Sequence, residues 1–117
     1  MLTKVGIGRA GEDYSVKFLK KQGYKILSRN FRTSIGEIDI IAFDKDTLVF
    51  VEVKMRSTIK YGFPEEAVTT RKLRTIKRVA DVFIKKHKYG KVKYRIDVMS
   101  ILINNRNIVR TKLIKMY

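Results

Sequence analysis

Three carboxylates and one lysine stand out because they lie in the most apolar part of a strongly basic chain. The sequence has 27 Lys and Arg against 11 Asp and Glu, and its formal net charge is +16. Glu37, Asp39 and Glu52 nevertheless fall among Ile, Val and Phe, and Lys54 follows Glu52 by two positions. Carboxylate oxygens are hard ligands for divalent cations, and an ammonium group stabilises charge that develops on phosphate. This pattern predicts a metal-dependent phosphodiesterase site.

The turn at residues 44–47 decides whether these side chains meet. A hairpin loop of two residues or of four residues places Asp39 opposite Glu52 and Glu37 opposite Lys54, on one face of the hairpin. A loop of three residues would shift the register by one and separate them. The opposite face is then expected to carry Ile38, Ile40, Val51 and Val53.

Facing carboxylates need a compensating charge. Paired side chains lie about 5 Å apart, and at an effective dielectric of about 20 two full charges at that distance repel by roughly 3 kcal/mol. Protonation of one acid, Lys54 or a divalent cation would relieve this repulsion. Mg²⁺ binds through one or two carboxylates and keeps several waters, which leaves room for a phosphate and an attacking water. We therefore expect Mg²⁺, or Mn²⁺, as the cofactor.

The charge distribution predicts a polyanionic partner. The sequence pI is about 10.3, and residues 71–95 contain 11 basic residues and a single acid, Asp81. For the charge alone, a solvated lysine-rich surface of the kind found in heat-adapted proteins is the alternative. A membrane surface is not expected, because the basic helix lacks a face rich in Trp and Phe beyond what a core requires.

Composition excludes several other kinds of site. The chain has no cysteine and one histidine, His87, so disulfides, thiolate zinc sites and His-centred triads are excluded. The longest apolar runs have four residues, far too few for a membrane span or a signal peptide. We expect one nuclease-like domain over residues 1–117, soluble and cytoplasmic.

The predicted fold class is α/β, with a central mixed sheet of about five strands flanked by helices in the order α-β-β-β-α-β-β. After a loose lead-in at residues 1–8, a helix is expected from Arg9 to Gln22, where Gly23 ends it. Glu12 lies on the inward stripe of this helix. A second helix should begin at Thr69 or Thr70 and end near Lys88. The expected strands are Tyr24 to Arg32, Glu37 to Phe43, Leu48 to Met55, Lys93 to Ile103 and Ile108 to Ile114.

The motifs together resemble a known family. The Asp39 and Glu52-Val53-Lys54 pattern resembles the restriction-endonuclease-like superfamily, which is described by its Asp and Glu-x-Lys signature. Over nearly the whole chain the sequence is similar to the YraN family of uncharacterised bacterial proteins, relatives of archaeal Holliday junction resolvases. The segments that carry this resemblance are Gly11-Glu12, Gly23-Tyr24, Arg29-Asn30-Phe31-Arg32, Gly36-Glu37-Ile38-Asp39, Val51-Glu52-Val53-Lys54 and Arg56.

The resemblance implies roles for particular residues. Asp39 and Glu52 would be metal ligands together with the Val53 carbonyl, Lys54 would be the catalytic lysine, and Glu12 would be an acid that the first helix brings to the site. Ile38 stands where many superfamily members have proline.

Several of these residues have simpler interpretations. Glu52 and Lys54 could be ordinary charges on a strand surface, because positions i and i+2 share a face. Glu37 could act in catalysis or form a structural ion pair with Lys54, and Glu12 could be an acid of the first helical turn. Asp97 is expected to be structural. The candidate nucleic-acid contacts are Arg32, Arg56, Arg71, Lys72 and Arg74.

The leading hypothesis is thus a magnesium-dependent nuclease that acts on DNA, with branched or structured DNA as a candidate substrate. The alternatives are a non-catalytic nucleic-acid-binding protein that keeps the fold and a protein-interaction adaptor. The sequence does not choose between DNA and RNA. A homodimer is a candidate assembly, because resolvase relatives act as two-fold dimers on paired scissile sites.

Overall fold

One mixed five-stranded sheet with a helix on each face organises the chain, as predicted. The computed structural model describes residues 4–116, and the side chains of residues 9–116. Its elements are α1 (Lys4–Lys21), β1 (Lys25–Arg32), β2 (Glu37–Asp44), β3 (Thr47–Arg56), the short 3₁₀ helix η1 (Pro64–Ala67), α2 (Thr70–Lys86), β4 (Lys93–Asn104) and β5 (Asn107–Lys115).

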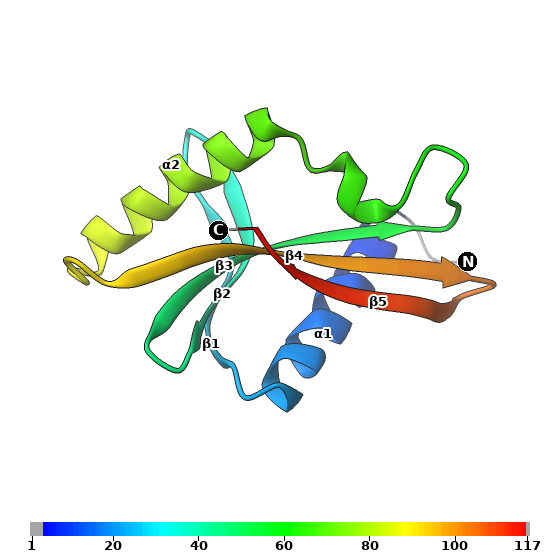
Figure 1. Ribbon diagram of the computed structural model, residues 1–117, viewed down its shortest axis with the longest axis horizontal. Coiled ribbons are helices and arrows are strands. Elements are labelled where there is room, and N and C mark those ends of the chain that lie inside the picture. Colours follow the sequence, from blue (N-terminus) through cyan, green and yellow to red (C-terminus); the bar gives the residue numbers. More distant parts are fainter. Residues whose placement is uncertain (1–3, 117) are drawn as a thin grey trace.

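The strands lie in sequence order across the sheet, β1-β2-β3-β4-β5. The first three strands form an antiparallel meander, β3 and β4 pair in parallel, and β4 and β5 form a second antiparallel hairpin. A parallel pair needs a crossover connection, which η1 and α2 provide (Figure 1). The sheet therefore has β3 at its centre, and this strand carries Glu52 and Lys54.

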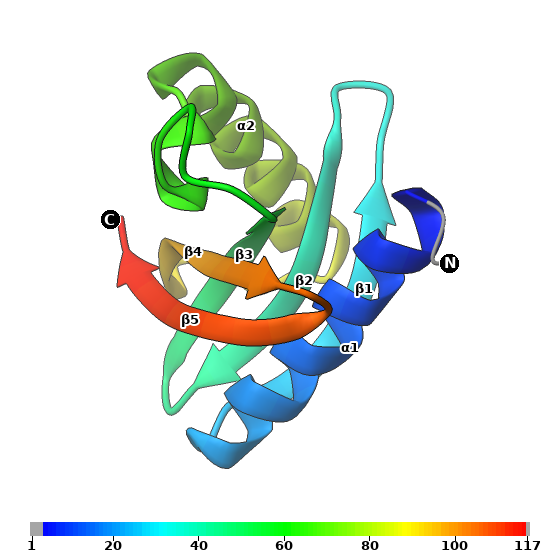
Figure 2. The same cartoon turned by 90° about the vertical axis from the view of Figure 1, so that its right-hand side faces the viewer.

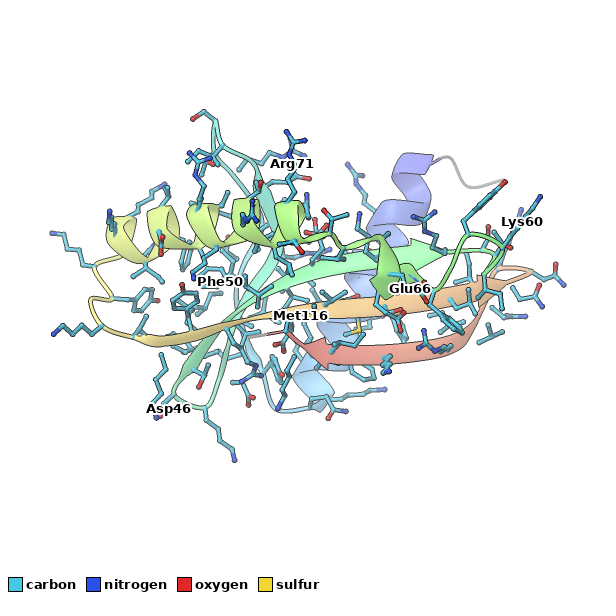
Figure 3. All side chains as sticks on the ribbon, turned by 45° about the horizontal axis from the view of Figure 1, so that its top comes forward. Asp46, Phe50, Lys60, Glu66, Arg71 and Met116 are labelled. Atoms are coloured by element: carbon cyan, nitrogen blue, oxygen red, sulfur yellow. The ribbon has the colours of Figure 1, made fainter. Side chains whose placement is uncertain are left out.

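Two apolar cores cover the two faces of the sheet. On one face, Ile76 and Phe83 of α2 pack over Ile41 and Phe50, and Figure 3 shows Phe50 beneath this helix. On the other face, Leu19 of α1 is fully buried among strand residues that include Ile40, Val51, Met99 and Ile101. Figures 1 and 2 show α1 and α2 on opposite sides of the strands. Each fully buried large side chain contributes about 1.5–3 kcal/mol of hydrophobic free energy.

The ends of the helices differ in part from the prediction. α1 begins at Lys4, five residues before the predicted start, so residues 4–8 of the expected lead-in are helical; residues 1–3 lie outside the described residues. Gly23 follows the helix with a φ of +92°, as expected for a glycine stop. Thr69 caps α2 by accepting a hydrogen bond from the Lys72 backbone N–H, and the helix ends at Lys86.

The β2–β3 hairpin has the predicted register. Ile41 pairs with Phe50 and Asp44 with Thr47 across a two-residue turn. The ordered pairing of these strands ends at Ile40 and Val51, one step before Asp39 and Glu52. One prediction about the faces is wrong: Ile38 packs into the core under α2, whereas Ile40 and Val51 lie in the core under α1. Side chains therefore alternate regularly between the two faces of the sheet in the second half of β2, but not at its start.

No helix within residues 4–116 combines the length and the apolar character that a membrane span requires.

Candidate active site

Asp39 lies where the pairing of β2 with β3 stops. Its Oδ2 atom accepts a 2.8 Å hydrogen bond from the backbone N–H of Val53, so a side chain replaces the backbone carbonyl as acceptor at this step. This hydrogen bond fixes the carboxylate against the Glu52-Val53-Lys54 segment. The predicted convergence of Asp39 with this segment is thus present, through a side-chain contact that the register alone did not indicate.

Glu52 is the buried carboxylate of the group. Its side chain is 7% exposed, and its Oε1 atom lies 3.8 Å from Nζ of Lys54 and 3.9 Å from Nζ of Lys72. Both distances exceed those of a direct hydrogen bond. Lys54 comes from the same strand, two residues on, and Lys72 comes from the first turn of α2, three residues after the cap. Glu52 is therefore a buried carboxylate that neither neighbouring lysine binds through a direct hydrogen bond.

Burial raises the pKa of each of the three acids Glu12, Asp39 and Glu52, and the charge of Asp39 adds to the rise for Glu12 and Glu52. Burial, and next the charge of Asp39, raise the pKa of Glu52 to about 7, although Lys72 and Lys54 oppose the shift. Burial also raises the pKa of Asp39, against the lowering effect of the Val53 N–H. Burial and the charge of Asp39 raise the pKa of Glu12. Burial is therefore the main cause of the raised pKa values at this site, and the neighbouring carboxylates add to it.

Glu12 reaches this region from the opposite helix. Its side chain is 16% exposed, and its Oε1 atom is buried without a hydrogen bond, 3.7 Å from the Arg29 guanidinium. Because α1 begins at Lys4, Glu12 lies in the helix interior, and the interpretation as a first-turn acid is wrong. Arg29 was quoted above only as part of a motif, so its contact with Glu12 was not predicted.

Two glycines permit the close packing around these acids. A Cβ atom on Gly36 would lie 2.9 Å from Cγ2 of Thr75, so the absence of a side chain lets α2 approach the start of β2. A Cβ atom on Gly11 would lie 2.8 Å from Cε of Met55, which is the mobile end of a flexible side chain. Gly36 is therefore the stricter requirement. It brings the first turns of α2, with Lys72, toward Asp39.

Glu37 has a different partner from the one predicted. Its carboxylate accepts a 2.9 Å hydrogen bond from Arg32, its neighbour across the β1–β2 pair, and the predicted pairing with Lys54 does not occur. Lys54 faces Glu52 instead. Glu37 still acts on the site through its charge, since it contributes to the raised pKa values of Asp39 and Glu52.

The predicted phosphate contacts occupy two kinds of place. Arg56, Arg71 and Arg74 have exposed side chains, and Figure 3 shows Arg71 on the first turns of α2. Lys72, in contrast, is partly buried beside Glu52. Arg32 is exposed but engaged by Glu37. Lys72 is thus the predicted contact nearest the acids, and the three exposed arginines extend the positive surface outward.

Asp97 belongs to a separate buried group and is structural, as expected. It is fully buried and accepts hydrogen bonds from Arg95 and from the hydroxyl of Tyr24. The same Arg95 also binds Asp44 at 2.8 Å. Burial, and then the charge of Asp97, raise the pKa of Tyr24 to about 12, so the phenol stays protonated. This network ties Tyr24, the residue just before β1, to β2 and β4.

The residues fit a magnesium ion in part. The buried Glu52, the half-buried Asp39 and the Oε1 atom of Glu12, which has no hydrogen bond, are hard oxygen donors whose cationic neighbours lie beyond direct hydrogen-bond distance or are not paired with them. In residues 4–116 no three His, Asp or Glu side chains are already grouped as a complete metal cluster. Mg²⁺ needs only one or two carboxylates when a phosphate and waters fill the remaining positions, and Asp39 and Glu52 supply that number.

The mixed sheet, the crossover helix and the acid pair with its lysine define an α/β protein with a restriction-endonuclease-like arrangement. The chain belongs to the uncharacterised protein family UPF0102, the YraN family of the sequence comparison above, whose sequence model matches residues 11–101. A UPF0102 protein of Caldicellulosiruptor saccharolyticus is 48% identical over 92% of both chains, and one of Caldicellulosiruptor bescii is 49% identical over 93% of both. A third, from Persephonella marina, is 44% identical over 84% of both.

Proposed function

We propose that the protein is a magnesium-dependent nuclease that hydrolyses phosphodiester bonds in DNA in the cytoplasm, and that branched or structured DNA is its substrate. The observation that supports this most is the position of Glu52, a buried carboxylate beside Asp39 with two lysines within 3.9 Å. A purely structural role for Glu52 does not explain this combination, because a buried charge that only stabilises the fold is normally paired at hydrogen-bond distance.

In this proposal Asp39 and Glu52 hold the magnesium ion, with the Val53 carbonyl as a further ligand. Bound there, the ion would neutralise phosphate charge and favour deprotonation of a water molecule. The Val53 N–H donates to Oδ2 of Asp39, so the other carboxylate oxygen of Asp39 would be the one to bind the cation. Val53 thereby links the two ligands through its backbone.

The two lysines have complementary tasks. Lys54 and Lys72 approach Glu52 from different elements, β3 and α2. An ammonium group placed beside the scissile phosphate stabilises the charge that grows there as water attacks phosphorus and the leaving oxygen departs. We assign this role to Lys54, and we assign binding of the same or the adjacent phosphate to Lys72.

The surface around the site suits a nucleic acid. Arg71 and Arg74 are exposed on the same helix as Lys72, and Arg56 is exposed at the end of β3. Cationic side chains at a nucleic-acid surface bind by releasing counterions, so the affinity should fall steeply with salt. A four-way junction presents paired scissile sites, and a two-fold dimer of this chain would match them.

A non-catalytic nucleic-acid-binding protein is the second candidate. The exposed arginines of α2 do not contact the acids in any pair described above, so binding does not require Asp39 or Glu52. This candidate predicts full binding without any cleavage.

Cleavage and binding measured on the same substrates separate the two. A labelled four-way junction and a linear duplex are incubated with the wild type, Asp39→Asn and Lys54→Ala, with and without Mg²⁺. The nuclease predicts magnesium-dependent cleavage by the wild type and a loss of at least about 100-fold in both variants, while binding stays within a few-fold. A wild type that binds in a salt-sensitive way and never cleaves would support the second candidate.

A further inference from the structure

The loop between β3 and η1, residues 57–63, exposes an unusual amount of apolar surface for so basic a protein. The Tyr61 side chain is 78% exposed, the highest value among the large hydrophobic residues of the described chain, and Ile59 and Phe63 are 53% and 38% exposed. No sequence pattern marked these residues as part of a site. Their exposure is not needed for the fold, because the two cores are complete without them.

The loop combines this apolar surface with positive charge. No acid occurs between Glu52 and Glu65, whereas Arg56 and Lys60 both lie in this stretch. The Lys60 ammonium group lies 5.5 Å from the centre of the Tyr61 ring. The Arg110 guanidinium lies 4.4 Å from the centre of the Phe63 ring. Aromatic rings interleaved with cations are characteristic of surfaces that bind single-stranded nucleic acid.

A rigid base holds the loop in position. Glu65, the second residue of η1, accepts hydrogen bonds from Arg110 of β5 at 2.7 and 2.9 Å and from the buried Ser100 of β4 at 2.6 Å. Gly62, with a φ of +101°, turns the chain between the two rings. The end of the loop is therefore fastened to two strands while its rings face outward, which lowers the entropy cost of binding something to them.

The loop is also an extension of the candidate active site along the chain. It directly follows β3, which carries Glu52 and Lys54, and through η1 it leads into α2, which carries Lys72. Figure 3 shows Lys60 at the end of the molecule opposite to Asp46, which marks the β2–β3 turn. A strand of nucleic acid that passes Lys54 toward Arg56 would continue onto this loop.

We propose that the loop at residues 57–63 binds unpaired bases of the nucleic acid, with the Tyr61 ring stacked on a base and Lys60 and Arg56 on the flanking phosphates. The occupant follows from the charge of the loop itself: Arg56 and Lys60 lie in a stretch without an acid between Glu52 and Glu65, and such a surface attracts a polyanion. The inference rests on the proposed function, and it narrows the substrate class to branched or structured DNA with unpaired nucleotides next to the cleaved bond, as at a flap or a bubble.

The test compares affinities for two matched probes, a fully paired duplex and the same duplex with a short single-stranded bubble, in buffer without divalent cations. Tyr61→Ala should weaken binding of the bubble by about tenfold, because stacking on one base contributes about 1–3 kcal/mol, and should leave duplex binding within twofold. Tyr61→Phe should bind the bubble like the wild type, since it keeps the ring. Val109→Ala, which removes exposed apolar surface from nearby β5 without a ring, should have no effect. A 2-aminopurine base in the bubble should lose fluorescence on binding to the wild type but not to Tyr61→Ala.

Three results would overturn the inference. If Tyr61→Ala weakened binding of the duplex and of the bubble equally, Tyr61 would not be specific for unpaired bases. If it weakened binding of neither probe, Tyr61 would not contact the nucleic acid. A wild-type dimer in sedimentation that becomes monomeric in Tyr61→Ala would assign the loop to contacts between copies. The proposed function is tested separately. If the wild type cleaves DNA in Mg²⁺ and Lys54→Ala does not, the active-site assignment holds regardless of the result for Tyr61→Ala. If the wild type binds neither probe, both proposals fail.

Discussion

The backbone N–H of Val53 donates a 2.8 Å hydrogen bond to Oδ2 of Asp39, at the step where the β2–β3 pairing ends. A carboxylate thereby takes the place of a backbone carbonyl. The strands can separate without leaving that N–H unsatisfied, and the acid is held beside Glu52.

Asp39→Asn should lower the pKa of Glu52. The charge of Asp39 is the second cause, after burial, of the rise of that pKa to about 7. The amide oxygen of asparagine can still accept from Val53, so the geometry is kept while the charge is lost. Titration of the Glu52 carboxyl carbon by NMR should move from about 7 toward the ordinary value of 4.5. An unchanged titration would mean that the two acids do not interact as described.

Glu52→Gln should stabilise the cation-free protein at alkaline pH. Because the folded-state pKa of Glu52 is raised from 4.5 to about 7, the folded wild type binds more protons than the unfolded chain between these values and loses stability as the pH rises through them. The variant lacks this loss. Its free energy of unfolding at pH 8 should exceed that of the wild type by as much as about 3 kcal/mol.

Thermal unfolding at pH 4 and pH 8, with and without Mg²⁺, measures this effect. At pH 4 the difference should vanish, because Glu52 is protonated in both states of the wild type. Magnesium should stabilise the wild type at pH 8 and leave the variant nearly unchanged. A variant that is less stable than the wild type at pH 8 would contradict the assignment.

Glu65→Gln should destabilise the protein at neutral pH and not in acid. The hydrogen bonds from Arg110 and then from Ser100 lower the pKa of Glu65 to about 2, so its contribution is present above pH 4.5 and disappears as the pH falls from 4.5 toward 2. The loss at pH 7 should be about 2 kcal/mol, the scale of hydrogen bonds to a charged group. Glu66→Gln, an exposed neighbour, is the matched control and should change the unfolding free energy little. Equal losses at pH 7 and pH 2 would show that charge is not involved.

Gly36→Ala should destabilise the fold, and Thr75→Ser should rescue it. The added Cβ would lie 2.9 Å from Cγ2 of Thr75, a β-branched side chain with little freedom in a helix. The expected cost is about 1–3 kcal/mol. Serine removes the clashing methyl group and keeps the hydroxyl that donates to the Arg71 carbonyl. Denaturant unfolding of the single and double variants tests this pair, and an unrescued double variant would locate the clash elsewhere.

Much of the fold follows from local pattern. The strands, the cap at Thr69 and the hairpin register came from alternation and turn chemistry, which act over a few residues. The convergence of Asp39 and Glu52 was predicted for a hairpin loop of either two or four residues, and the structure has the two-residue turn. Glu12 was placed on the inward face by helical spacing, without information about how far the helix extends before it.

The remainder depended on tertiary contacts. The burial of Ile38 under α2 and the pairing of Glu37 with Arg32 arise where the sheet stops alternating regularly, and no local pattern marks that point. The approach of Lys72 to Glu52 requires α2 to pack over the sheet. Gly36 permits this packing, although it lies far from α2 in the sequence. Nothing in the sequence distinguishes Tyr61 from an aromatic residue of the core, and only the structure shows that its side chain is exposed.

The position of a divalent cation tests the central claim most directly. Crystals of the protein soaked in Mn²⁺ should show an anomalous difference peak about 2.0–2.3 Å from a carboxylate oxygen of Asp39 and of Glu52, and Glu52→Gln crystals should lack it. A peak elsewhere, or side chains of Asp39 and Glu52 that point apart in those crystals, would contradict the account.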